Sequence, residues 1–114
     1  MPRIYKICPQ QLWRQTGQDG VFPGSAADRA DGFMHFSAPD QVAETARRHF
    51  AGQAGLLLIA VDADRLGAQL KWEPARGGAR FPHLYGPLPL HAVVAVEPLA
   101  LGADGHHVLP ELAP

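Results

Sequence analysis

Two histidines lie in short motifs that combine aromatic, glycine and polar residues. His35 is part of residues 32–37 (Gly-Phe-Met-His-Phe-Ser), and His83 is part of residues 81–88 (Phe-Pro-His-Leu-Tyr-Gly-Pro-Leu). An imidazole can take up or release a proton near neutral pH, and a nearby carboxylate can tune it. Glu73 is the carboxylate that we expect beside these rings. The sequence therefore suggests acid–base chemistry, with His35, Glu73 and His83 as the catalytic groups.

Four more residues are candidates for holding a ligand: Tyr5, Ser37, Arg80 and Tyr85. Ser37 precedes a predicted helix, whose first-turn N–H groups have no partner within the helix and can bind an anion. Arg80 follows a glycine-rich turn and is a candidate phosphate contact. Tyr85 precedes Gly86, where the missing side chain would let a ligand approach the backbone.

Structural interpretations of the same residues remain open. A histidine in a strand is often a hydrogen-bonded, partly buried ring, and glutamate is usually exposed. Tyr85 fits a core position with a satisfied hydroxyl, and an arginine is solvated by default. Ser37 lacks a Gly-x-Ser-x-Gly turn, so a hydrolase triad has little support. The sequence contains no phosphate-binding loop and no dinucleotide-binding glycine motif.

The chain has six histidines and one cysteine. The histidines form no i, i+4 pair and no tight cluster with carboxylates, so we expect no metal site. Cys8 has no second cysteine with which to form an internal disulfide or a zinc cluster, and we expect a buried, inert thiol. A histidine-rich cleft that holds a metal is the less favoured alternative.

The elements that must position the candidate residues are short. An alternating strand is predicted over residues 3–7 and a helix over residues 9–16, followed by a long loop over residues 17–31 with one helical turn near its end. Residues 32–37 read as a strand that places Phe33, His35 and Ser37 on one face. Ser37 would then cap the next helix.

The second half alternates between apolar runs and turns. An amphipathic helix is predicted over residues 39–50, because its apolar residues share one stripe. The continuous apolar run at residues 56–61 predicts a central strand buried on both faces. Strands follow at residues 69–73 and 91–97, and Pro98 is expected to end the last one. Three prolines predict that residues 80–90 run extended or turning along an edge.

Composition limits the classes of protein. With 114 residues, of which 46% are hydrophobic, we expect one domain over residues 1–114. The net charge is −1 with a pI near 6.6, which does not favour a broad nucleic-acid-binding surface. The longest apolar run is too short to cross a membrane, and the N-terminus has no signal-peptide pattern, so we expect a cytoplasmic protein.

Five segments resemble, in their order and spacing, the bacterial family called domain of unknown function 952. They are residues 4–7 (Ile-Tyr-Lys-Ile), 31–37 (Asp-Gly-Phe-Met-His-Phe-Ser), 57–62 (Leu-Leu-Ile-Ala-Val-Asp), 70–73 (Leu-Lys-Trp-Glu) and 81–88 (Phe-Pro-His-Leu-Tyr-Gly-Pro-Leu). The resemblance covers residues 3–97, nearly the whole chain. It leaves residues 99–114 as a C-terminal tail.

The resemblance implies a small α+β fold with a split, mixed and mostly antiparallel sheet and two or three short helices. It relates the chain to the ADP-ribosyltransferase-like group, which includes the tRNA 2′-phosphotransferases and binds NAD in a cleft of the sheet. A strand of His-Val-His-Leu-Ser type in those enzymes is similar to residues 34–37. Glu73 would take the place of a glutamate that many ADP-ribosyltransferases use. Their His-Gly-Thr motif has no match in the first strand, which reads Tyr5-Lys6-Ile7.

We therefore expect an enzyme-like protein that binds NAD, ADP-ribose or another phosphorylated small molecule and transfers a ribosyl or phosphoryl group. Glu73 would orient a ribose hydroxyl or act as a base, and His35 and Ser37 would hold nicotinamide or ribose. The phosphate would meet Arg80 and the helix that starts after Ser37. The alternative is a non-catalytic module that binds a small ligand or a peptide. An RNA end stays open as a partner.

Overall fold

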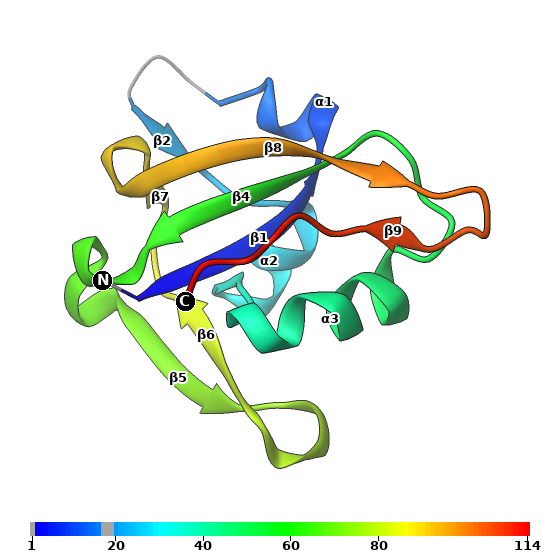
Figure 1. Cartoon of the computed structure of the whole chain (residues 1–114). Helices are drawn as coiled ribbons and strands as arrows, with labels where there is room; N and C mark the ends of the chain where they lie inside the picture. The colour runs from blue at the N-terminus through cyan, green and yellow to red at the C-terminus, as the bar shows by residue number, and fades with distance from the viewer. Residues whose placement is uncertain (1, 17–19) are drawn as a thin grey trace.

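The computed structural model of the protein describes residues 2–16 and 20–114. The α+β fold is built on a four-stranded antiparallel sheet in the order β1-β4-β8-β9 (Figure 1). These strands are β1 (Arg3–Pro9), β4 (Leu56–Asp62), β8 (Val93–Leu101) and β9 (His107–Val108). Every residue of β4 is buried, which confirms the predicted central strand at residues 56–61.

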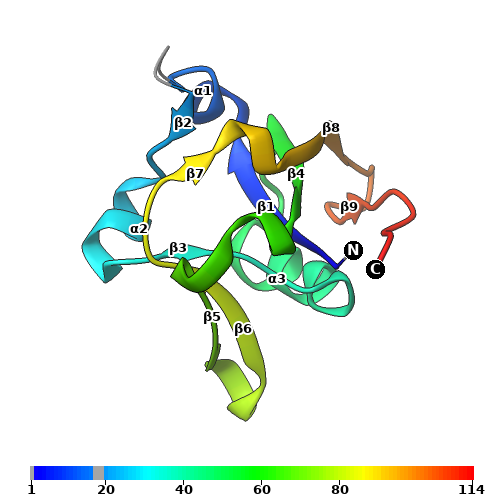
Figure 2. The same cartoon turned by 90° about the vertical axis from the view of Figure 1, so that its left-hand side faces the viewer.

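A second sheet carries both histidine motifs. Its three antiparallel strands have the order β3-β6-β5 and are β3 (Met34–His35), β6 (Arg80–Leu84) and β5 (Leu70–Pro74). Strands β5 and β6 form a hairpin that projects from the body of the molecule in both views (Figures 1 and 2). Tyr5 and Ser37 join the two sheets by exchanging two backbone hydrogen bonds of 2.8 Å. A further pair consists of β2 (Val21–Phe22) and β7 (Leu88–Pro89).

The described residues contain three short α-helices, which are α1 (Gln10–Trp13), α2 (Ala26–Asp31) and α3 (Val42–His49). The amphipathic helix predicted over residues 39–50 begins as a 3-10 turn at Pro39–Gln41 and continues as α3. The helix predicted over residues 9–16 is limited to α1, because Pro9 still belongs to β1. No helix in the described part of the chain is long and apolar enough to cross a membrane.

Strand β1 is buried on both faces, whereas its alternating sequence predicted a half-buried strand. Ile4 and Cys8 pack into one apolar cluster, while Tyr5 and Ile7 pack into another beneath α3. Lys6 made the strand look amphipathic, but its ammonium group is buried and paired with a carboxylate. The prediction was wrong because the sequence does not show this partner.

Strand β6 is the centre of its sheet, although three prolines predicted an edge. The backbone N–H of Phe36 donates to the carbonyl of Pro82 at 3.1 Å. Antiparallel ladders usually exchange such bonds in pairs, and Pro82 has no N–H to return one. Strand β3 ends at His35, just before this position. The sheet therefore tolerates a central proline by shortening the neighbouring strand.

Pro98 does not end the last long strand, because β8 continues to Leu101 and pairs there with β9. The alternation of the ladder, counted from the Tyr5–Ser37 bonds, turns the nitrogen of Pro98 toward the open edge of β8. Leu99 is buried, and Leu109 and Leu112 pack against the cluster that contains Tyr5. Three leucines of residues 99–114 therefore pack on the folded core.

The segment predicted as a long loop is partly ordered into secondary structure. Residues 17–19 of that prediction lie outside the described residues. Strand β2 and helix α2 occupy much of the rest. The predicted helical turn is confirmed as α2, where the hydroxyl of Ser25 accepts from the Asp28 N–H and the Asp28 carboxylate accepts from the Ser25 N–H. Gly32 ends the helix at a φ of 84°, which favours glycine.

Candidate active site

The strand register brings four of the predicted site residues onto one face of the β3-β6-β5 sheet. His35 lies opposite His83, and their ring centroids are 5.8 Å apart. On the neighbouring strand, Glu73 contacts His83 with 2.9 Å between Oε1 and Nδ1. The hydroxyl of Tyr85 donates to the same Oε1 at 2.6 Å. His35, Glu73, His83 and Tyr85 therefore form one polar cluster.

Phe33 is the aromatic centre of this cluster. Its ring stacks on His83 with a centroid distance of 4.1 Å and an angle of 28° between the planes. The same ring lies 4.8 Å from His35 and 5.4 Å from Tyr85. The alternation of the strand had placed Phe33 on the face of His35, but the sequence analysis did not select it as a site residue. It restricts how the two imidazoles can move.

A second set of charged side chains lies around His35 on the side of α2. Asp28 Oδ1 lies 2.6 Å from Nδ1 of His35, and Asp31 Oδ2 lies 2.9 Å from Nε2. The buried ammonium group of Lys6 contacts Asp28 Oδ2 at 3.0 Å and donates to the carbonyl of His35. Lys6, Asp28 and Asp31 were not predicted as site residues. Lys6 and Asp31 lie in the family-like segments 4–7 and 31–37, and the Ser25-x-x-Asp28 capping pattern indicates the start of the helix that carries both aspartates.

The electrostatics of the two carboxylates follow from these contacts. Burial alone would raise the pKa of Asp28, but the hydrogen bond to His35 and the charge of Lys6 outweigh it and hold the pKa well below its usual range. The hydrogen bond from Tyr85, followed by that from His83, lowers the pKa of Glu73. The same bond to Glu73 raises the pKa of Tyr85. Both carboxylates are therefore ionised at neutral pH.

A cavity of about 580 Å³ opens beside this cluster. Its wall includes His35, His83 and Asp28 on one side and residues of β1 and α3 on the other. This volume is within the range of small-molecule sites. Lys6 is the only lysine or arginine among the described residues that line the cavity, and it is already paired. The wall is therefore mostly apolar, and its polar groups include histidines, carboxylates and hydroxyls.

The free edge of β1 forms part of the cavity wall. Tyr5 uses its backbone N–H and carbonyl to bond Ser37, so the backbone groups of Ile7, two residues on, face the same outward direction. No bond to these two groups is present among the described residues. Cys8 is buried as predicted, and burial raises the pKa of its thiol to about 11. A ligand in the cavity would thus meet one open N–H and one open carbonyl.

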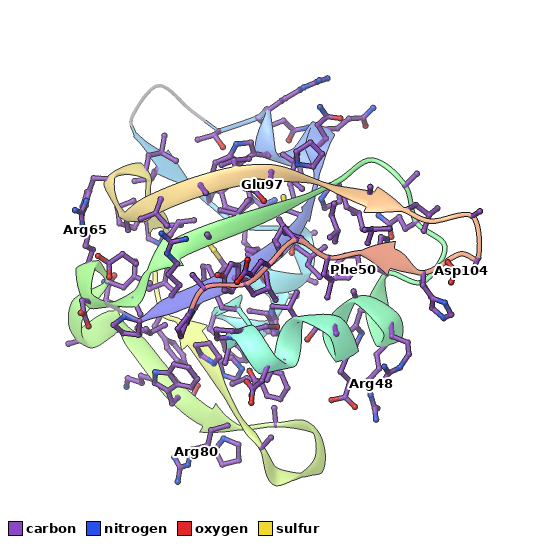
Figure 3. All side chains as sticks on the ribbon, in the orientation of Figure 1. Arg48, Phe50, Arg65, Arg80, Glu97 and Asp104 are labelled. Carbon is purple, nitrogen blue, oxygen red and sulfur yellow. The ribbon has the colours of Figure 1, made fainter. Side chains whose placement is uncertain are left out.

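Three predicted ligand contacts are engaged elsewhere. The hydroxyl of Tyr5 donates to the carbonyl of Ala113 at 2.7 Å, and the hydroxyl of Ser37 lies 2.9 Å from that of Thr45. Both Tyr5 and Ser37 still line the cavity. Arg80 projects from the β5–β6 hairpin (Figure 3), donates to the carbonyl of Trp72 and does not line the cavity.

The helix start after Ser37 also differs from the prediction. Ala38, not Ser37, is the cap residue, and its N–H donates to the side-chain oxygen of Gln41 at 2.8 Å. The side-chain oxygen of Gln41 already accepts from the Ala38 N–H, and the first turn is a 3-10 turn. The expected phosphate site therefore lacks one of its N–H groups. Among the described residues, no group of three or more His, Cys, Asp or Glu side chains is arranged to hold a metal ion.

The fold and the cluster define a small α+β protein with two carboxylate–histidine pairs at one cavity. The family described as "Protein of unknown function (DUF952)" matches residues 7–96, and the chain belongs to this family. This confirms the predicted resemblance to domain of unknown function 952. None of the curated proteins compared matches the chain.

Solved structures of one relative, protein CC0527 from Caulobacter crescentus, are similar over almost the whole length. Its crystal structure is 52% identical, covers 93% of each chain and has a TM-score of 0.88. The solution structure of the same protein is 53% identical, covers 93% of this chain and 91% of that chain, and has a TM-score of 0.81. The agreement supports the fold described above.

Proposed function

We propose that the cavity binds a nucleotide of NAD or ADP-ribose type and that His83 moves a proton on the bound ligand. The observation that carries the proposal is the Glu73–His83 pair at the cavity wall. Glu73 is ionised and can only accept, so Nδ1 of His83 carries the hydrogen and Nε2 is left with a lone pair when the ring is neutral. Nε2 has no partner among the described residues. This is the arrangement of a general base.

The charges at the cavity favour the nicotinamide riboside end of such a ligand inside it. Asp28 and Asp31 line the cavity, and Glu73 contacts His83 without lining it. Lys6 is the one lysine or arginine among the described lining residues, and it is paired with Asp28. A cationic ring is therefore better suited to this site than a phosphate group. The open N–H and carbonyl of Ile7 match the carboxamide of nicotinamide, which has one acceptor and two donor hydrogens.

The proposed reaction is the transfer of the ribosyl group to a hydroxyl. The bond between C1′ and the nicotinamide nitrogen breaks, and nicotinamide leaves as a neutral molecule with the bonding electrons. The acceptor oxygen bonds to C1′, and its proton passes to Nε2 of His83. The split antiparallel sheet is compatible with the ADP-ribosyltransferase-like group, and we include this fold relation in the proposal.

Calorimetric titration with NAD, ADP-ribose, nicotinamide and AMP tests the proposal. We expect NAD to bind and His83→Gln to weaken its affinity about tenfold or more, the effect of losing a hydrogen bond of about 1.4 kcal/mol. His106→Gln is the matched control, because His106 forms an exposed pair with Asp104 that does not line the cavity. Absence of binding to all four compounds at millimolar concentration would show that the proposal is wrong.

Catalysis is separated from binding by incubating the protein with NAD and following release of nicotinamide by chromatography. Release that is lost in His83→Gln supports a transferase. Binding of NAD without any release, with or without added small alcohols, would favour the alternative of a non-catalytic binding module, which the engaged hydroxyls of Tyr5 and Ser37 also allow.

A further inference from the structure

Tyr85 does not line the cavity, yet it is the residue most directly connected to the Glu73–His83 pair. We infer that Tyr85 is a positioning residue that holds the Glu73 carboxylate and thereby fixes which nitrogen of His83 carries the hydrogen. The inference deepens the role that the proposed function gives to His83. It changes the role predicted for Tyr85 from a ligand contact to a group that acts through Glu73.

The geometry of the shared oxygen supports this role. Oε1 of Glu73 accepts from the Tyr85 hydroxyl at 2.6 Å and contacts Nδ1 of His83 at 2.9 Å. A single oxygen that receives two donors fixes the rotation of the carboxylate more firmly than either donor alone. The Glu73 side chain is 35% exposed, so packing by itself does not hold it in place. The tyrosine hydroxyl supplies the second anchor.

The surroundings of Tyr85 keep its own ring in place. Phe33 lies 5.4 Å from the Tyr85 ring, and the ammonium group of Lys71 lies 5.3 Å from its centroid on the other element of the hairpin. The backbone N–H of Tyr85 donates to the carbonyl of Gln69 at 2.8 Å. Tyr85 is thus attached by its backbone to Gln69, the residue before β5, and by its hydroxyl to Glu73 on β5 itself.

Protonation follows from the same contacts. The Tyr85 bond is the largest cause that lowers the pKa of Glu73, while the bond to Glu73 raises the pKa of Tyr85. The carboxylate therefore stays ionised and the phenol keeps its proton over the range in which an imidazole titrates. Neutral His83 then has a fixed donor at Nδ1 and a lone pair at Nε2 through that range.

The test measures the tautomer of neutral His83 by nitrogen-15 NMR of the ligand-free protein. In the wild type we expect the form with hydrogen on Nδ1. Tyr85→Phe keeps the ring and removes the hydroxyl, and we expect it to shift the tautomer ratio about fivefold toward the other form, because the Glu73 carboxylate loses one of its two donors. Glu73→Gln should shift it at least as far, because an amide can offer either a donor or an acceptor.

Tyr5→Phe is the control, since its hydroxyl bonds Ala113 and has no link to Glu73. An unchanged ratio in Tyr85→Phe, together with a shift in Glu73→Gln, would overturn the inference. An equal shift in Tyr5→Phe would do the same, as would an unchanged ratio in Glu73→Gln. None of these outcomes depends on a ligand, so failure to bind NAD would end the proposed function and leave the role of Tyr85 intact.

Discussion

The two carboxylate–histidine pairs at the cavity have opposite burial. In the first, the Asp28 side chain is 5% exposed and the His35 side chain is 43% exposed. In the second, Glu73 is 35% exposed and His83 is 9% exposed. The buried members of the two pairs differ in the number of their partners. Asp28 is bound by Lys6, Ser25 and His35, whereas His83 has only Glu73 as a hydrogen-bonding partner among the described residues.

This difference suggests that the two pairs have different roles. The Asp28 pair is saturated with internal partners, since both nitrogens of His35 face carboxylates and both oxygens of Asp28 are engaged. Such a group stabilises the junction between β1, α2 and β3. The His83 pair leaves Nε2 available. We therefore expect changes in the first pair to alter stability and changes in the second to alter ligand chemistry.

The largest effect is expected for Asp28→Asn. Removing one partner of a buried ion pair leaves Lys6 charged without compensation, and we expect a loss of roughly 3 kcal/mol in the free energy of unfolding, measured by urea denaturation. Asp104→Asn in the exposed Asp104–His106 pair is the control and should leave the midpoint unchanged. A loss below about 1 kcal/mol would mean that the first pair does not hold the fold.

Acid should weaken the fold through the same group. The pKa of Asp28 is lower in the folded than in the unfolded protein, so its stabilisation is complete above the unfolded value of about 4 and is lost as the pH falls through the lower folded value. We therefore expect the unfolding free energy of the wild type to fall as the pH is lowered from about 4 to about 2. The Asp28→Asn variant should show a smaller fall over that range. Equal pH dependence in both proteins would contradict the assignment.

Cys8 offers a local measure of the first pair. With a pKa of about 11, roughly one thiol in a thousand is ionised at pH 8, so labelling by a thiol reagent should be slow. Cys8 lies on the same strand as Lys6, and we expect Asp28→Asn to speed labelling severalfold because it loosens this corner. Glu73→Gln should label at the wild-type rate. Fast labelling of the wild type would show that the thiol is not shielded.

The smallest effect on stability is expected for Glu73→Gln. Its carboxylate is partly exposed and its bonds to His83 and Tyr85 lie at the rim, so the denaturation midpoint should match that of the wild type within error. The same variant should weaken NAD binding. A clearly lowered midpoint would show that both pairs stabilise the fold, and the contrast between them would be lost.

The sequence predicted many of the residues that surround His83. The alternation of residues 69–73 and 32–37 placed Glu73 and His35 on definable faces, and the family motifs joined them to His83. The ion pair of Asp28 could not be predicted from the sequence, because it depends on a contact between α2 and β1, two elements far apart in sequence. The sequence predicted a helical turn near the end of residues 17–31, but it did not indicate that Asp28 on this turn contacts Lys6 of β1.

Prolines produced the clearest errors in the fold. Pro82 was expected to place its segment at an edge and Pro98 was expected to end a strand, yet Pro82 lies in the central strand of its sheet and Pro98 lies within β8. The rule that proline breaks a ladder applies only where its nitrogen faces a partner that needs a donor. That direction is set by register, which follows from the pairing of distant strands. The sequence shows the proline but does not show which way its nitrogen points.

The bond between Tyr5 and Ala113 spans 108 positions of the chain. In Figure 1 the last segment runs back along β1, and β1 itself pairs with a strand more than 50 residues later. Contacts of this separation slow folding, because the ends of a long loop must meet before any bond forms. During synthesis, β1 can pair only after β4 has been made, and the Tyr5 hydroxyl can form its bond only after Ala113 has been made. We therefore expect folding on the millisecond-to-second scale, with the C-terminal segment docking last.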